Sequence, residues 1–318
     1  MAPLETTEAK RAPDAARTFE SSAAIEEESH LPALEHAVSV VVPAFNEGTH
    51  VARQIRDIAG VIEATGRVYE IIVVDDGSRD GTGEAALAEG TRVLRNRYNR
   101  GYGAPLKRGI KAAEHPWILI IDGDGAYPAA AVPELLERAD TVEMVVGART
   151  TDRREIPLVR RPAKWFLTWL ASYLAEEKLP DLNSGLRLIR RDLVEMYRHL
   201  LLSGFSFTTT ITLAAACDDH EVAYVPIDYL ARKGKSKIRP GPAFDFLLLV
   251  LRIIVFFNPL RVFIPIGLMM ALVGLAGLAY DLTLQNISES ALLGLLGAMI
   301  VWSLGLLADQ NARVARRP

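Results

Sequence analysis

The chain has 318 residues, half of them hydrophobic, which is enough for one catalytic domain of ordinary size and an appended segment. Its formal net charge of -3 is small, and we expect no nucleic-acid partner. The single cysteine, Cys217, excludes an intramolecular disulfide and makes a reducing compartment the default. It follows a run of alanines, where a small buried filler is expected and not a nucleophile.

The first 36 residues are rich in Glu, Ala, Ser and Thr and contain no apolar core of a signal peptide. Residues 1–36 are therefore predicted to be a disordered acidic tail. The catalytic domain is predicted to follow, over residues 37–238.

Three apolar runs in this domain are predicted to be buried parallel strands that end in polar residues. The polar ends are Asn46–Glu47, Asp75–Asp76 and Asp122–Asp124. Asn46 and Glu47 are predicted to open an amphipathic helix, so strand and helix alternate, which favours an α/β, Rossmann-like fold with a mostly parallel sheet. Such sheets bind ligands beyond the carboxyl ends of their strands, which predicts one shared pocket. The alternative is a set of solvated turns.

Asp122 and Asp124 stand two residues apart, directly after the apolar run Trp117–Ile121. Carboxylate oxygens suit Mg²⁺ or Mn²⁺, which take few protein ligands and complete their shell with water and substrate phosphates. The pair is a candidate metal site of a nucleotide-sugar enzyme. A plain Asp-Gly-Asp turn would look the same.

Several motifs resemble glycosyltransferase family 2 over roughly residues 37–260. In chain order they are Val41–Glu47, Asp75–Ser78, Asn99–Gly103 and Asp122–Asp124. Two further segments, Asn183–Arg187 and Arg232–Lys237, resemble those of the polyprenyl-phosphate branch, whose members are similar to dolichol-phosphate mannose synthase. The resemblance implies a GT-A fold and inverting transfer of a hexose to a polyprenyl phosphate, dolichyl or undecaprenyl. The donor would be GDP-mannose, UDP-glucose or UDP-N-acetylglucosamine.

The resemblance also implies residue roles. Nucleotide-sugar contacts are expected from Pro43, Ala44, Asn46, Glu47, Asp75, Asp76, Gly101, Gly103, Asp122, Gly123, Asp124, Arg149 and Ser184. The catalytic set is expected to be Asp122, Asp124, Arg187, Arg232, Ser236 and Lys237, with the metal on Asp122 and Asp124. Ala126 stands where some relatives carry glutamine, which leaves a third protein ligand to the metal open.

A basic segment, Arg232–Arg239, contains a glycine and a serine among its cations. Because a flexible backbone with a hydroxyl donor can wrap a phosphate, Arg232, Ser236 and Lys237 are predicted to clamp the acceptor phosphate or the donor diphosphate. The alternative is a polybasic patch that only attracts anionic lipid.

Two apolar runs, Val262–Tyr280 and Ala291–Ala308, each approach the roughly 20 residues that a helix needs to cross a bilayer. They predict a transmembrane hairpin over residues 261–308, with a basic cytoplasmic tail at 309–318. The alternative is a buried helical pair in a soluble domain. Two small-residue pairs, Gly267 with Ala271 and Gly294 with Ala298, predict close helix packing within the hairpin or between copies in a homo-oligomer.

A juxtamembrane segment, residues 239–260, precedes the hairpin. Its apolar stretch Ala243–Phe257 is interrupted by Asp245 and Arg252, which favours a helix in the membrane interface over a third crossing, although the crossing remains the alternative.

Basic residues flank the hairpin at Arg261, Arg313, Arg316 and Arg317, whereas residues 281–290 contain none. This asymmetry predicts that both ends face the cytoplasm. The protein is therefore expected in the plasma membrane or an ER-type membrane, with a cytoplasmic catalytic domain.

The expected mechanism is a single displacement by a lipid phosphate. A phosphate monoester is already largely ionised at neutral pH, so no general base is needed. The segment Gly204–Thr210, where related enzymes often show an acidic residue, offers hydroxyls and no carboxylate. Two alternatives are a family 2 transferase acting on another lipid or polysaccharide acceptor and a non-catalytic membrane scaffold.

Overall fold

The computed structural model describes residues 35–150, 168–173, 175–201, 207–229, 243–285 and 288–315. Its centre is a sheet with the strand order β3-β2-β1-β4-β6-β5-β7. The strands are β1 (Val38–Ala44), β2 (Tyr69–Asp75), β3 (Arg92–Arg95), β4 (Trp117–Ile120), β5 (Met144–Arg149), β6 (Arg187–Arg190) and β7 (Val222–Ile227). Among these described strands, β6 alone runs antiparallel to its neighbours, β4 and β5. The predicted mostly parallel sheet is confirmed.

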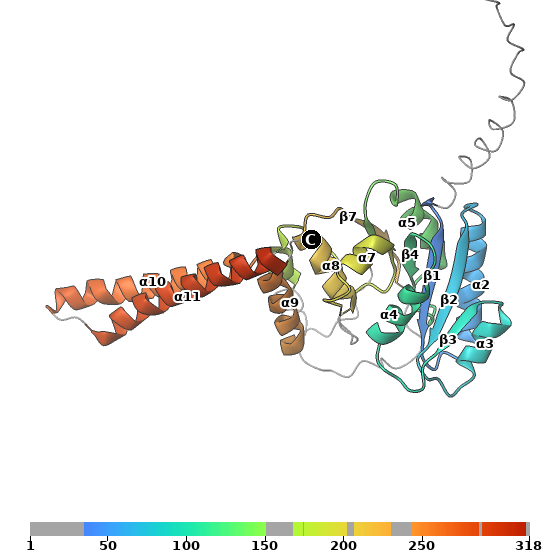
Figure 1. Ribbon diagram of the computed structural model, residues 1–318, viewed down its shortest axis with the longest axis horizontal. Helices are drawn as coiled ribbons and strands as arrows, with labels where there is room; N and C mark the ends of the chain where they lie inside the picture. Colours follow the sequence, from blue (N-terminus) through green and yellow to red (C-terminus); the bar gives the residue numbers. More distant parts are fainter. Residues whose placement is uncertain are drawn as a thin grey trace, which may run out of the picture.

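Helices cover both faces of the sheet (Figure 1). One face carries α2 (His50–Glu63), α3 (Thr82–Ala88), the short 3-10 helix η1 (Ala129–Ala131) and α5 (Val132–Arg138). The other carries α4 (Gly103–Ala112), α7 (Arg191–Met196) and α8 (Phe207–Cys217). Each face has its own apolar core, because successive side chains of a strand point to opposite faces. Cys217 is buried at the end of α8, as expected of a filler.

The turn after β1 differs from the sequence prediction, because α2 begins at His50 and not at Asn46. Asn46 has φ 52°, a left-handed conformation that cannot start a helix. Its backbone N–H donates to the Ser78 hydroxyl (2.9 Å). The next two N–H groups both donate to the Thr82 hydroxyl (2.9 Å each), which fixes the turn against the start of α3.

Helix α9 (Ala243–Phe257) crosses the base of the hairpin and packs on the catalytic domain (Figure 1). Val250, Ile253, Ile254 and Phe257 are buried on its inner face. Its 15 residues span about 22 Å at about 1.5 Å per residue, less than the roughly 30 Å of a bilayer core. Helix α9 is thus shorter than a bilayer core, and its place in the membrane interface stays a prediction.

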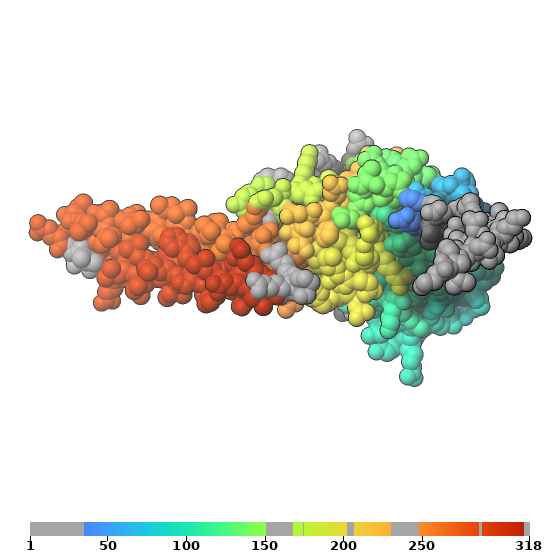
Figure 2. Space-filling model, turned by 45° about the horizontal axis from the view of Figure 1, so that its top comes forward, coloured from blue at the N-terminus to red at the C-terminus, as the bar shows by residue number. Residues whose placement is uncertain are grey.

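The hairpin consists of α10 (Leu260–Thr283) and α11 (Glu289–Ala315) and projects from the body as a rod (Figure 2). Both helices are long and apolar enough to cross a membrane, and only 17% of each apolar window is buried. A helical pair buried in a soluble domain would hide these side chains, whereas Met269, Leu272 and Val273 are more than half exposed. The two helices therefore have the length, apolarity and exposure of a pair that could span a membrane.

The small residues of the hairpin face the partner helix. A side chain on Gly267 would clash with the Trp302 indole, and one on Gly294 would meet the Gly274 Cα at 3.1 Å. Ala271 and Ala298 are buried in the same contact. Both predicted small-residue pairs therefore serve close packing within the hairpin.

Gly274→Ala is expected to destabilise the hairpin by about 1 kcal/mol or more, because the new Cβ would lie 3.0 Å from the Leu295 backbone nitrogen, which cannot move aside cheaply. Gly277→Ala in the same helix is the matched control, since its Cβ would make an ordinary 3.5 Å contact with Ala291. The thermal unfolding midpoint of the full chain in detergent micelles measures both. Equal midpoints would show that the two helices do not pack as described.

Candidate active site

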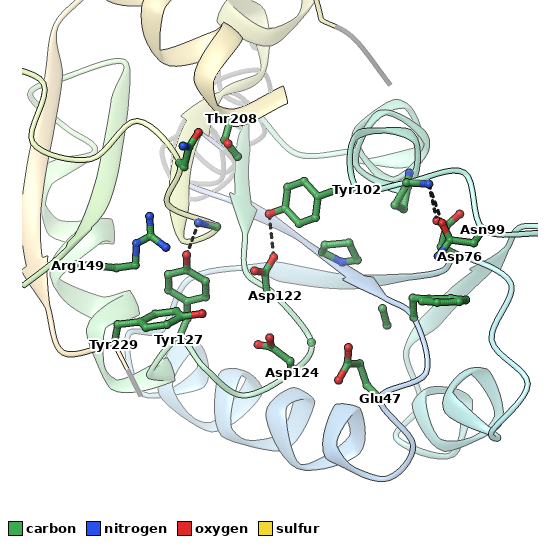
Figure 3. A pocket seen from close by; sticks show the side chains of 18 residues that line it. Glu47, Asp76, Asn99, Tyr102, Asp122, Asp124, Tyr127, Arg149, Thr208 and Tyr229 are labelled. Atoms are coloured by element: carbon green, nitrogen blue, oxygen red, sulfur yellow. Dashed lines mark hydrogen bonds between the residues drawn. The ribbon is translucent and has the colours of Figure 1, made fainter. Parts of the chain in front are cut away.

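A pocket of about 420 Å³ opens at the carboxyl ends of β1, β2 and β4 (Figure 3). It is bounded after β1 by Pro43, Ala44, Phe45 and Glu47, and on one side by Asp76, Asn99, Gly101, Tyr102 and Pro105. Asp122–Asp124 and Tyr127 line it after β4, and the opposite wall consists of Arg149, Asn183, Gly185, Thr208 and Tyr229. The three polar strand ends thus meet in one cavity, as the alternation of strands and helices predicted.

The two acids at the end of β2 point to different places. Asp75 is fully buried and accepts hydrogen bonds from the Ser78 backbone (2.8 Å) and from Arg95 Nε (2.9 Å), so it braces the turn behind the pocket. Asp76 lines the pocket and accepts from the backbone N–H groups of Arg100 (2.9 Å) and Gly101 (3.1 Å). Asp76 therefore holds the glycine-rich loop in the pocket wall.

Asp122 and Asp124 both project into the pocket (Figure 3). Tyr102 donates its hydroxyl to Asp122 Oδ1 (2.8 Å), and the Ala126 backbone donates to Asp124 Oδ1 (3.0 Å). Burial and the neighbouring Asp122 charge raise the pKa of Tyr102 well above its usual value, so this phenol stays a donor. A Cβ on Gly185 would lie 2.6 Å from Asp122 Oδ2. The absence of a side chain at 185 is what makes room for this carboxylate.

The residues at this edge fit a hard divalent cation. The described residues contain no group of three or more His, Cys, Asp or Glu side chains able to enclose a metal, so a resident ion would have few protein ligands. Two carboxylates in a roomy pocket match Mg²⁺ or Mn²⁺, which complete their shell with water and phosphate oxygens. Asp122 and Asp124 are the residues that would hold it.

The loop before β6 is fixed by buried polar contacts. Tyr127 Oη accepts from the Gly185 backbone N–H (2.6 Å), and the Ser184 hydroxyl donates to the Gly147 carbonyl (2.5 Å). Arg187 is fully buried and donates to the carbonyls of Ser184 (3.1 Å from Nε) and Thr208 (3.0 Å). Burial lowers the pKa of Arg187 from its usual value. This guanidinium lies behind the pocket wall and ties the loop to α8.

On the opposite wall, Arg149 forms a two-pronged ion pair with Asp181, with Nε and Nη2 at 2.7 and 2.9 Å. Burial acts to raise the pKa of Asp181, but the hydrogen bonds and charge of Arg149 outweigh it, so the pKa lies below its usual value. The guanidinium carbon also lies 5.4 Å from the ring centre of Tyr229, which packs edge-on against Tyr127 at 5.0 Å. Arg149 and the two rings thus form one wall of the pocket, and Asp181 holds the guanidinium in place behind it.

Nine predicted site residues line the pocket, and five described ones do not. Those in the lining are Pro43, Ala44, Glu47, Asp76, Gly101, Asp122, Gly123, Asp124 and Arg149. Those outside it are Asn46, Asp75, Gly103, Ser184 and Arg187, which shape turns, the loop or the helix start behind the wall. Arg232, Ser236 and Lys237 lie outside the described residues.

Sequence reasoning missed several lining residues, chiefly Tyr102, Tyr127 and Tyr229. Tyr102 lies inside the motif Asn99–Gly103, and its phenol hydroxyl is a sequence signal for a hydrogen-bond donor to the acids. Tyr229 follows a strand at the far side of the sheet, and no local pattern links it to the pocket. Thr208 also lines the pocket, and it belongs to the segment where related enzymes often show an acidic residue.

Comparisons with known proteins agree with this geometry. Residues 39–198 match the family described as Glycosyl transferase family 2. The chain belongs to glycosyltransferase family 2. Residues 258–314 match the GtrB C-terminal hairpin, the segment that here forms α10 and α11. The protein is accordingly a glycosyltransferase with a GT-A fold and a hairpin anchor.

Relatives of this family 2 chain include a dolichyl-phosphate hexose transferase of Haloferax volcanii, 30% identical over 64% of this chain and 87% of that one. An undecaprenyl-phosphate 4-deoxy-4-formamido-L-arabinose transferase of Klebsiella pneumoniae is 28% identical over 75% and 73%. One similar solved structure is glucosyl-3-phosphoglycerate synthase from Mycobacterium tuberculosis in complex with Mn²⁺, UDP-glucose and phosphoglyceric acid. Its TM-score is 0.55 at 23% identity, over 69% of this chain and 79% of that one. This likeness supports the fold.

Proposed function

We propose that this enzyme transfers a hexose from a nucleotide-diphosphate sugar to a polyprenyl phosphate. The observation that carries the proposal is the union, in one chain, of an acid-lined pocket at the strand ends with a hairpin of two exposed apolar helices. A soluble acceptor would not require the hairpin. The two relatives named above are transferases to dolichyl and undecaprenyl phosphate, which supports a lipid phosphate as acceptor.

The donor is proposed to lie with its diphosphate at Asp122 and Asp124. A Mg²⁺ or Mn²⁺ ion held there would neutralise charge on the departing nucleotide diphosphate. Tyr102 keeps the Asp122 carboxylate oriented by its 2.8 Å hydrogen bond. Glu47 and Asp76, which line the β1 and β2 side of the pocket, are proposed to contact the nucleoside. The glycine-containing loop held by Asp76 would let the backbone approach it closely.

The acceptor is proposed to enter from the side of Thr208 and Asn183. The Thr209 hydroxyl donates to the Asn183 side-chain oxygen, which fixes that amide at the pocket rim. Thr208 supplies no carboxylate that could act as a base, and an ionised phosphate needs none. The basic residues Arg232, Ser236 and Lys237 remain the proposed clamp for a phosphate.

The catalytic domain is proposed to face the cytoplasm of a plasma membrane or ER-type membrane. Arg261 at the start of α10 and Arg313 near the end of α11 flank the hairpin on the domain side, whereas the turn at 281–290 carries no Lys or Arg. Nucleotide sugars are made on that side, so the donor reaches the pocket directly.

The test is transfer of radiolabelled sugar from a panel of nucleotide sugars to polyprenyl phosphate in detergent or vesicles. The expected product is an acid-labile lipid whose formation needs the full chain and a divalent cation. Metal-dependent nucleotide binding without a labelled lipid would overturn the acceptor assignment, and the absence of nucleotide binding would leave only a scaffold.

A further inference from the structure

A second groove, of about 530 Å³, lies at the base of the hairpin. It is formed by α9, by the last turns of α11 and by the segment after α7, and its walls include His199, Leu249, Arg252, Ile253, Phe256 and Asn311. It shares no lining residue with the pocket of Asp122 and Asp124. The groove is therefore a separate site and not an extension of the catalytic pocket.

The groove combines apolar walls with one guanidinium, Arg252, for which the described residues supply no ionic partner. Arg252 makes no hydrogen bond or ion pair with any residue in the described part of the chain. The acid closest to the groove along α11, Asp309, is held by Arg313 Nε at 2.8 Å. Arg252 is exposed at the edge of these apolar walls. An exposed cation beside apolar walls favours an anionic ligand with a hydrocarbon part, because a phosphate binds the guanidinium through charge-assisted hydrogen bonds while the hydrocarbon covers the walls.

The position of the groove places it at the membrane surface. The antiparallel pairing brings Gly305 of α11 against Leu260 and Phe263 at the start of α10, so Ala308 and Asn311 lie beyond the first turn of α10, toward the catalytic domain. Figure 1 shows this junction where α9 crosses the hairpin.

An aromatic pair marks the same level. Trp169 and Tyr173 stack at 5.7 Å and are about half exposed, and Arg261 donates to the Tyr173 carbonyl (3.1 Å). Amphipathic rings gather at the headgroup level of a bilayer.

We propose that this groove binds one anionic membrane phospholipid, with its phosphate on Arg252 and its acyl chain along the apolar wall between α9 and α11. Asn311 and His199 offer further polar contacts at the groove. The last residues of the chain are unsuited as occupants, because Arg316 and Arg317 carry the same charge as Arg252. The bound lipid fixes α9, and with it the catalytic domain, against the bilayer.

The experiment titrates the full chain in detergent micelles with phosphatidylglycerol or phosphatidylcholine and counts bound lipid by native mass spectrometry. Wild type is expected to retain phosphatidylglycerol preferentially. Arg252→Gln is expected to weaken this binding about tenfold, the effect of losing one charge-assisted hydrogen bond, and Arg252→Lys to restore part of it. Arg53→Gln removes the same charge from an exposed position on α2, away from the groove, and is expected to bind like wild type.

Asn311→Glu is the second variant, since residue 311 is exposed and its substitution spares the core. The new carboxylate would compete with the lipid for Arg252 and should also weaken binding. The proposal would be overturned by equal retention of the two phospholipids or by equal losses in Arg252→Gln and Arg53→Gln. Displacement of phosphatidylglycerol by polyprenyl phosphate would also overturn it. A change of oligomeric state in Arg252→Gln would instead assign the groove to a second copy. None of these outcomes affects the sugar-transfer assay.

Discussion

Asp124→Asn is expected to weaken metal-dependent binding of a nucleoside diphosphate by more than about 100-fold. Losing a residue that only hydrogen-bonds to a metal ligand usually costs less than this, and Asp124 is proposed to bind the metal itself. Asparagine keeps the size of the side chain and an oxygen that can accept from the Ala126 backbone, so the turn after β4 should persist. The negative charge is lost, and hard cations prefer carboxylate oxygens. Calorimetric titration with UDP and with GDP, each with and without Mn²⁺, measures the effect.

Asp57→Asn is the matched control, because Asp57 is exposed on α2 and only approaches Arg53 at 3.8 Å. Such a surface pair contributes a few tenths of a kcal/mol at most, so binding should equal that of wild type. If Asp124→Asn also bound nucleotide with unchanged metal dependence, the cation would have to be held elsewhere and the donor arrangement would be wrong.

The part of the site that could be predicted from sequence is the part that follows strand ends. Runs such as Trp117–Ile121 are short and apolar at every position, because both faces of the strand are buried. The helices between them are longer and apolar on one face only. Because parallel strands share one carboxyl edge, three polar strand ends had to meet there. The hairpin could also be predicted from sequence, because the prediction needs only the length and the apolarity of the two runs.

Other features depend on contacts between residues far apart in the chain. Asp75 and Asp76 are neighbours in sequence, and only the packing of Arg95 against β2 shows that the first is structural. Arg187 looked like a ligand-binding arginine, but it comes from the antiparallel strand and turns into the core toward Thr208. No period or spacing encodes which way such a side chain turns.

Gly185→Ala is expected to lower kcat/KM for sugar transfer by about 100-fold, the scale of a misplaced catalytic group, while leaving the fold intact. The backbone at 185 does not have a positive φ, so alanine meets no conformational strain there. The new methyl would instead lie 2.6 Å from Asp122 Oδ2 and 2.9 Å from Oδ1. Asp122 is short and is bonded to Tyr102, so the carboxylate must leave its position and its hydrogen bond together.

Gly60→Ala controls for the substitution itself, because a Cβ at residue 60 of α2 meets nothing within 4 Å. Alanine there should leave activity unchanged and stabilise the helix by about 0.5–1 kcal/mol. Assays of transfer and of Mn²⁺-dependent nucleotide binding, beside a thermal melt, separate the two variants. Full activity in Gly185→Ala would mean that Asp122 need not stand where the structure places it, and the pocket would then owe its chemistry to Asp124 alone. If Gly185→Ala instead lost activity only because the protein unfolds, the thermal melt would show it. Gly185 would then be assigned to the core, through the loop that Tyr127 and Arg187 hold.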